Sequence, residues 1–243
     1  MNAEYSQTVV RLPRVFYVAL AILMTVMVFV GFWPTYYGPL LTGVDVDKVP
    51  FIHFHAAVYV GWLALFVAQT VLAATGHTRI HMNLGKVGIV YGLLIIVVGT
   101  IAAFVMFAVR VKAGESDVAR MRLLGPLVDM IVFAPYFGAA IYNRSKPDRH
   151  KRLMIVATTS LLIAAVGRMT FLGSPPNMIG LQLIWISPIL LGIAYDLYTR
   201  RGISAIYVSG ILVLLAELNL RFYYGRQSEI WQELATWFAS FIS

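Results

Sequence analysis

The sequence has no cysteine and unusually little charge. Without cysteine the chain has no disulfides, no thiolate metal sites and no thiol chemistry. Only 12% of the 243 residues are charged, whereas about 25% is typical of soluble domains. Hydrophobic residues make up 60%. Because a water-soluble core cannot bury so much apolar surface, the composition predicts an integral membrane protein.

The sequence also lacks long hydrophilic stretches, internal repeats and low-complexity segments. We therefore expect a single transmembrane domain covering residues 1–243. The net charge of +8 lies mainly between the apolar runs. This placement indicates membrane orientation and contact with lipid headgroups, and it argues against a nucleic-acid partner.

Long apolar runs are what the sequence has in place of these features. A helix needs roughly 20 residues to cross the hydrocarbon core of a bilayer. Seven runs are long enough, namely Val15–Trp33, Phe54–Ala74, Leu84–Val109, Leu123–Tyr142, Leu153–Leu172, Met178–Tyr198 and Ile203–Tyr223. We expect an all-α, polytopic bundle of seven transmembrane helices. The first run follows Arg11 and Arg14 but is too long for a signal peptide and ends without a cleavage site, so it should remain as a helix.

Two further features concern placement in the membrane. Apolar residues recur at helical spacing from Ile230 to Phe241, which predicts a C-terminal amphipathic helix in the membrane interface. Lys and Arg are more frequent in the loops on the side of the N-terminus, which predicts a cytoplasmic N-terminus and an external C-terminus. The loop near residues 110–122 departs from this pattern, because it carries four basic residues on the other side.

A histidine and four glycines share one line along the third expected helix. His81, Gly85, Gly88, Gly92 and Gly99 all fall within about 40° of that line at 100° per residue. One interpretation is a seam of small residues where a neighbouring helix packs closely. The other is a groove for a flat macrocycle, with His81 as its axial ligand.

His150 offers a second axial ligand just before the fifth expected helix. The third and fifth helices run in the same direction, so His81 and His150 should lie at the same depth near the cytoplasm. Two imidazoles so placed can ligate one iron from opposite sides, as in b-type haem proteins. We therefore expect a haem b site formed by His81 and His150 with Gly85, Gly88 and Gly92.

A polar cluster is expected near the outer ends of the helices. Asp129, Arg168 and Glu217 lie within expected spans at a depth close to that of His55. A charge at the bilayer centre costs roughly 2.5 to 3.5 kcal/mol, so each should have a partner. Tyr59 and Trp62 share a helix face with His55 and would line the cluster. Asp196, another charge in a span, has Arg200 one turn further on.

This outer cluster has two interpretations. Two acids, one cation and an imidazole can bind a substrate or relay protons. Alternatively the residues form an ion-pair network, in which Glu217 also pairs with Arg221 four residues later. A metal ion held by His55 and His53 requires an extended backbone after Pro50, because on a helix these two side chains point about 160° apart.

Two short motifs resemble known families. The segment His81-Met-Asn-Leu-Gly85 resembles the His-x2-Leu-Gly opening of a core helix in the ascorbate-reducible two-haem transmembrane b cytochromes. The segment Arg149-His150-Lys-Arg-Leu-Met154 is similar to the Arg-His-x-Arg-x-Met segment of uncharacterised bacterial multi-pass membrane families. In the cytochromes the third and fifth helices of this kind hold one haem, and His81 and His150 match that pair.

The ligands of the second cytochrome haem are not matched in this sequence. The second haem of the cytochromes is held by histidines of the second and fourth helices, and here His55 faces Asp129 instead of a histidine. The resemblance therefore implies one haem b, with the outer side free for a metal ion, a quinone or another small substrate.

These observations predict a redox protein of the bacterial inner membrane. It would bind haem b near the cytoplasmic face and exchange electrons with a quinone or a periplasmic redox partner. Two alternatives remain. One is a membrane enzyme or metal-site protein that acts at the outer cluster, and the other is a transporter or a non-catalytic subunit of a larger membrane complex.

Overall fold

The computed structural model describes residues 3–44, 49–169, 171, 177–199 and 202–242, with backbone alone for 3–14, 223 and 226–227. The regular elements of this part of the chain are all helical. They are α1 (Ala3–Phe32), the π-helix η1 (Trp33–Tyr37), α2 (Gly38–Thr42), α3 (Pro50–Ala74), α4 (Thr78–Lys112), α5 (Ser116–Tyr142), α6 (Pro147–Ser160), α7 (Ile163–Val166), α8 (Met178–Tyr198), α9 (Ala205–Gln227) and α10 (Glu229–Ala239).

Six helices of the described chain are long and apolar enough to cross a membrane. They cover Val15–Thr42, Pro50–Ala74, Thr78–Lys112, Ser116–Tyr142, Met178–Tyr198 and Ala205–Phe222. This confirms the expected all-helical, membrane-embedded class. The helices extend beyond several of the expected runs, because the polar residues that flank an apolar run continue the same backbone hydrogen bonding.

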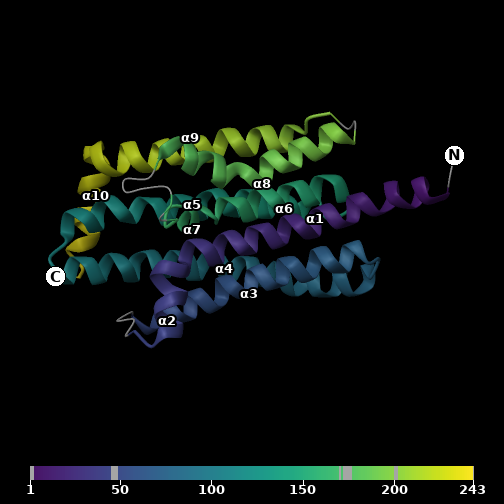
Figure 1. The fold of residues 1–243 in the computed structure, drawn as a ribbon. Helices are drawn as coiled ribbons and strands as arrows, with labels where there is room; N and C mark the ends of the chain where they lie inside the picture. Colours follow the sequence, from purple (N-terminus) through teal and green to yellow (C-terminus); the bar gives the residue numbers. More distant parts are fainter. Residues whose placement is uncertain (1–2, 45–48, 170, 172–176, 200–201, 243) are drawn as a thin grey trace.

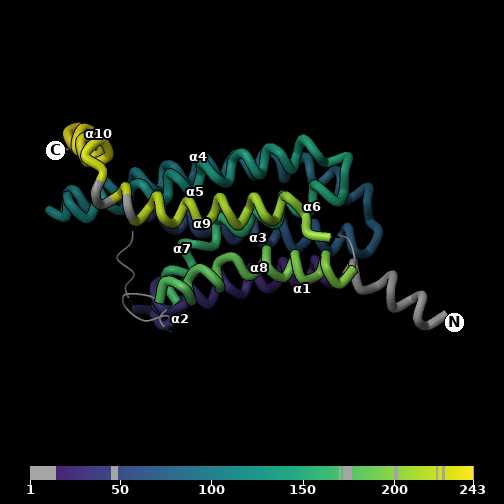
Figure 2. Tube along the Cα trace, turned by 90° about the horizontal axis from the view of Figure 1, so that it is seen from above, coloured from purple at the N-terminus to yellow at the C-terminus, as the bar shows by residue number. Residues whose placement is uncertain are grey.

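The long helices run side by side, so the molecule has two ends (Figure 1). At one, here called the α10 end, lie α2 and α10, and α10 crosses the direction of the long helices (Figures 1 and 2). At the other, here called the far end, lie the turns between α3 and α4 and between α5 and α6. Helix α5 is central and contacts α4, α6, α9 and α10.

The expected fifth span, Leu153–Leu172, is not one continuous helix. Helix α6 ends at Ser160 and α7 begins at Ile163. Between them the backbone amides of Leu161 and Leu162 donate to carbonyls three residues back, at 3.2 and 3.0 Å. Such bonds tighten the turn and interrupt the α-helical ladder. The chain still runs from the far end toward the α10 end through these two pieces (Figure 1).

Polar side chains account for the interruption. The Ser160 hydroxyl donates to the Ala157 carbonyl at 2.8 Å, and the indole N–H of Trp185 on α8 donates to the Thr159 carbonyl, also at 2.8 Å. Ser and Thr side chains that bond to backbone carbonyls compete with regular helix bonding. Ser160, whose hydroxyl makes such a bond, is therefore the sequence signal for this break.

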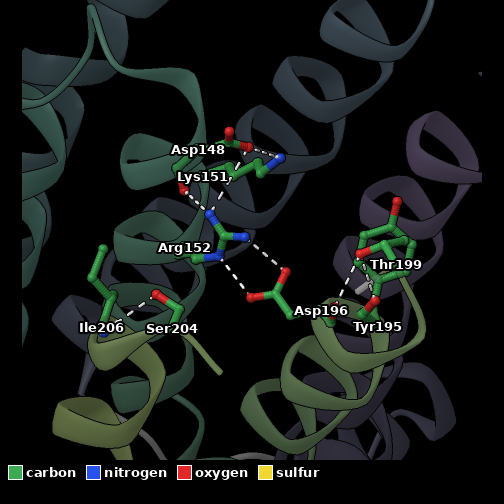
Figure 3. A network of polar contacts seen from close by, with 8 residues as sticks. All are labelled: Asp148, Lys151, Arg152, Tyr195, Asp196, Thr199, Ser204 and Ile206. Carbon is green, nitrogen blue, oxygen red and sulfur yellow. Dashed lines mark hydrogen bonds and ion pairs between the residues drawn. The ribbon is translucent and has the colours of Figure 1, made fainter. Parts of the chain in front are cut away.

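A buried ion pair joins α6 to α8 near the far end (Figure 3). The Arg152 guanidinium donates to both carboxylate oxygens of Asp196, at 2.7 and 2.9 Å, and to the Asp148 carbonyl at 2.8 Å. The Asp196 side chain is fully buried. Sequence spacing favoured Arg200 as its partner, but Arg200 lies outside the described residues, and the structure pairs Asp196 with Arg152.

Candidate functional site: a cavity at the α10 end

A cavity of about 580 Å³ lies among α1, α3, α4, α5 and the α6–α7 segment, toward the α10 end. Its walls are largely apolar. The apolar lining includes Val28, Phe32, Val60, Leu63, Ala102, Ala103, Met106, Phe107, Leu123, Met130, Leu161 and Leu162. A space of this size, with apolar walls and a few polar groups, is typical of a small-molecule site.

One face of α3 supplies part of its polar lining, as expected. His55, Tyr59 and Trp62 all border the cavity. The His55 and Tyr59 rings lie against each other, 4.2 Å between centroids, and the Tyr59 hydroxyl donates to the Ile95 carbonyl at 3.2 Å. The buried Trp62 Nε1 and His55 Nδ1 have no hydrogen-bond partner among the described residues.

Asp129 and Glu217 come together, as expected, through Arg221, which the sequence predicted only as a partner of Glu217. The Arg221 guanidinium on α9 donates a hydrogen bond to the Asp129 carboxylate on α5. It donates a second, at 3.0 Å, to Glu217, one turn earlier on α9. Both carboxylates are buried. This agrees with the ion-pair alternative for Glu217, and it gives Arg221 two carboxyl partners.

Arg168 does not join these acids. Its guanidinium lies over the Phe32 ring, 4.8 Å from the centroid, and donates to the Ala164 carbonyl. Within the described chain, no carboxylate lies within ion-pair distance of Arg168 or of Arg122. Arg110 interacts electrostatically with Arg122 and with the Glu115 carboxylate, and Arg168 interacts with Arg122 and Arg110.

The sequence analysis did not place Arg110 and Arg122 in a site. Both border the cavity, together with Arg168 and Arg221. The available signal was the excess of basic residues between the third and fourth expected spans, which departs from the usual charge asymmetry of membrane loops. Lining residues that are exposed, such as Arg122, Arg168, Val109 and Thr35, lie at the α10 end, so the cavity opens toward that end.

His53 and His55 do not form a metal site together. Helix α3 begins at Pro50, so both histidines are helical and the extended backbone that a shared ion required is not formed. His53 Nδ1 instead lies 2.9 Å from the Tyr36 hydroxyl. Across the described residues, no group of three or more His, Asp or Glu side chains could hold a metal ion.

His81 and His150 lie at the far end, on α4 and α6. The Nδ1 atom of His81 is 3.2 Å from the Gln69 carbonyl, and that of His150 is 2.8 Å from the Ala140 carbonyl. Burial lowers the pKa of His150, its bond to Ala140 opposes this, and the nearby His81 lowers the pKa further. When Nδ1–H donates to a carbonyl, Nε2 of the neutral ring keeps its lone pair and can ligate iron.

The line of glycines that follows His81 is partly filled by neighbouring side chains, which leaves less room for a macrocycle than expected. A Cβ atom on Gly92 would lie 2.2 Å from the Phe137 ring, and one on Gly99 would lie 2.3 Å from the Tyr59 hydroxyl. Neighbouring side chains therefore fill the line at these two positions, as the packing-seam interpretation requires. Gly85 and Gly88 have looser surroundings, with the nearest atoms at 3.5 and 3.7 Å.

Comparison with protein-family models, with curated proteins and with solved structures found no match for this chain. The function must therefore be argued from the site itself.

Proposed function

We propose that this membrane protein binds a lipid-soluble small molecule in the cavity at the α10 end, and that its chemical or transfer step takes place there. The observation that carries the proposal is the cavity of about 580 Å³, which has largely apolar walls and is also bordered by His55, Tyr59 and Trp62. Small-molecule sites commonly combine apolar walls with a few polar groups that orient the ligand.

Retention of a small molecule tests this proposal. The protein is purified in mild detergent, and mass spectrometry compares the apolar molecules that remain bound to the wild type and to two variants. Ala56→Phe fills the cavity, because Ala56 borders it, whereas Ala57→Phe adds the same ring to the exposed side of the same helix. We expect retention by the wild type and Ala57→Phe, and loss from Ala56→Phe. Equal retention by all three would contradict the proposal.

We further propose how the chain sits in the membrane. The six apolar helices and the interrupted segment from Leu153 to Met169 form seven crossings, with the N-terminus cytoplasmic in a bacterial inner membrane. Support comes from the Lys and Arg asymmetry of the loops. Helix α10 would lie in the outer interface, because Ile230, Trp237 and other apolar residues on it are exposed. The cavity then opens on the outer side.

A second candidate function is electron transfer by a haem b held at the far end by His81 and His150. The observation that favours it is the pair of Nδ1 contacts with the Gln69 and Ala140 carbonyls, since these orient both imidazoles and leave Nε2 free. The haem would supply one-electron chemistry, and a quinone or periplasmic protein would be its redox partner. Because the Phe137 ring occupies the space beside Gly92, the haem would lie beside Gly85 and Gly88.

The absorbance spectrum of protein from haem-replete cells tests this second candidate. A low-spin Soret band in the wild type, lost in both His81→Ala and His150→Ala but kept in His77→Ala, is the expected result. His77 is a matched control because it is an exposed histidine of the preceding turn. Colourless protein would rule the candidate out while leaving the cavity proposal intact.

A further inference from the structure

The cavity mouth carries more positive charge than the protein neutralises. Four arginines border the cavity, but Arg221 is matched by the carboxylates of Asp129 and Glu217. The other three, Arg110, Arg122 and Arg168, lie within range of one another's charge. Within the described chain, Arg122 and Arg168 make no ion pair.

Arg122 and Arg168 both lie beside the apolar walls. Arg122 lies six residues after Ser116, the first residue of α5, which is about 9 Å along the helix axis at 1.5 Å per residue. Arg168 is fixed by the Phe32 ring and the Ala164 carbonyl, so its side chain is held at the cavity. Arginines that are close together and beside a low-dielectric wall repel each other unless an anion lies between them.

From these observations we infer that the ligand of the cavity is an amphiphile with an anionic head, a carboxylate or a phosphate, which Arg110, Arg122 and Arg168 bind. Its apolar body lies along the walls formed by α1, α3 and α4. Planar guanidinium groups present paired N–H donors that match the oxygens of both anions. This inference rests on the proposed function, because it names the class of molecule that the cavity binds.

Thermal stabilisation by three single-chain probes tests the inference. Dodecanoate, dodecyl phosphate and dodecanol have the same chain and differ in the head. A molecule that binds only the folded state raises the melting temperature, and at equal concentration a tighter ligand raises it more, because the stabilisation grows with the logarithm of the ratio of ligand concentration to Kd. We expect both anions to raise the melting temperature of the wild type and Ala57→Phe, and dodecanol to have a much smaller effect. The stronger of the two anions identifies the head as fatty-acid-like or phosphate-like.

Arginine variants provide the second arm. Arg122→Gln and Arg168→Gln should each weaken binding of the preferred anion at least tenfold, and Arg168→Lys should recover only part of it. The matched control is Arg144→Gln, which removes one positive charge from an exposed position at the far end. It should bind the anion as the wild type does.

The outcomes separate the two proposals. If dodecanol stabilises the wild type as much as the anions do, and the arginine variants have no effect, the anion inference is wrong while the cavity proposal stands. If no probe stabilises the wild type, the anion inference is also wrong. The cavity proposal fails only if Ala56→Phe also retains the same native molecules as the wild type.

Discussion

Arg221 is the cation that two buried carboxylates share. The Asp129 and Glu217 side chains expose 10% and 1% of their surfaces, and Arg221 exposes 18%. Removal of a cation from such a group leaves negative charge in a low-dielectric interior, which costs more than the ion pair itself contributes. The cation and the acids therefore should not respond alike to substitution.

We predict that Arg221→Gln lowers the free energy of unfolding by about 3 kcal/mol, measured in mixed micelles. Glu217→Gln should cost less than about 1 kcal/mol, because a one-to-one pair of Arg221 and Asp129 remains. Asp117→Asn is the control, since its pair with Arg120 is largely exposed and should matter by about 0.5 kcal/mol or less. Equal losses in Arg221→Gln and Glu217→Gln would contradict this account.

Arg152 and Asp196 at the far end form a buried ion pair, so removal of either partner leaves the other charge in the interior without its buried counter-charge. Asp196→Ala leaves the Arg152 guanidinium without its two carboxylate bonds, and we predict a loss of about 3 to 5 kcal/mol. Asp148→Asn should have a much smaller effect. It keeps the bond from Arg152 to the Asp148 backbone carbonyl, and the Asp148 carboxylate, which pairs with Lys151 and Arg152, is exposed. The same micelle unfolding measurement distinguishes the two. A loss from Asp196→Ala below about 1 kcal/mol would show that the pair adds little.

At the scale of elements, the α6–α7 segment departs from a continuous helix between Ser160 and Ile163. Its break is held by the bond from the Trp185 indole to the Thr159 carbonyl, and Trp185 is fully buried. Because the break redirects the chain beside the cavity, it also decides where Leu161, Leu162 and Arg168 lie.

We predict that Trp185→Phe costs about 2 kcal/mol, of which about 1 is the lost hydrogen bond and the rest the smaller ring. Amide hydrogen exchange between Thr159 and Ala164 should become faster. Trp33→Phe, at an exposed tryptophan of η1, should leave both quantities unchanged. Unchanged exchange in Trp185→Phe would mean that the indole does not hold the break.

At the scale of the whole molecule, the number of crossings follows from whether α6 and α7 together span the bilayer. The α5–α6 turn comes directly before this segment. One long helix, α8, lies between the segment and the α8–α9 connection. If the segment crosses, these two connections lie on the same side of the membrane. If it does not, they lie on opposite sides.

We predict that reporter fusions after Lys146 and after Gly202 both indicate the cytoplasm, and that a fusion after Gly114 indicates the outer side. Gly114 and Gly202 lie in turns between helices, where insertion disturbs little packing. A cytoplasmic signal after Lys146 with an external signal after Gly202 would reduce the crossings to six. External signals at both would reverse the orientation.

The sequence by itself determined the membrane class, the approximate positions of most of the long helices and the shared face of His55, Tyr59 and Trp62. These follow from local quantities, namely the length of apolar runs and a repeat of 3.6 residues per turn. Tertiary structure alone decided the partners. Asp196 pairs with Arg152 and Asp129 with Arg221, at sequence separations of 44 and 92 residues, and three arginines from separate segments meet at one cavity. Helical periodicity fixes the direction of a side chain, but which distant side chain it meets depends on how the helices pack.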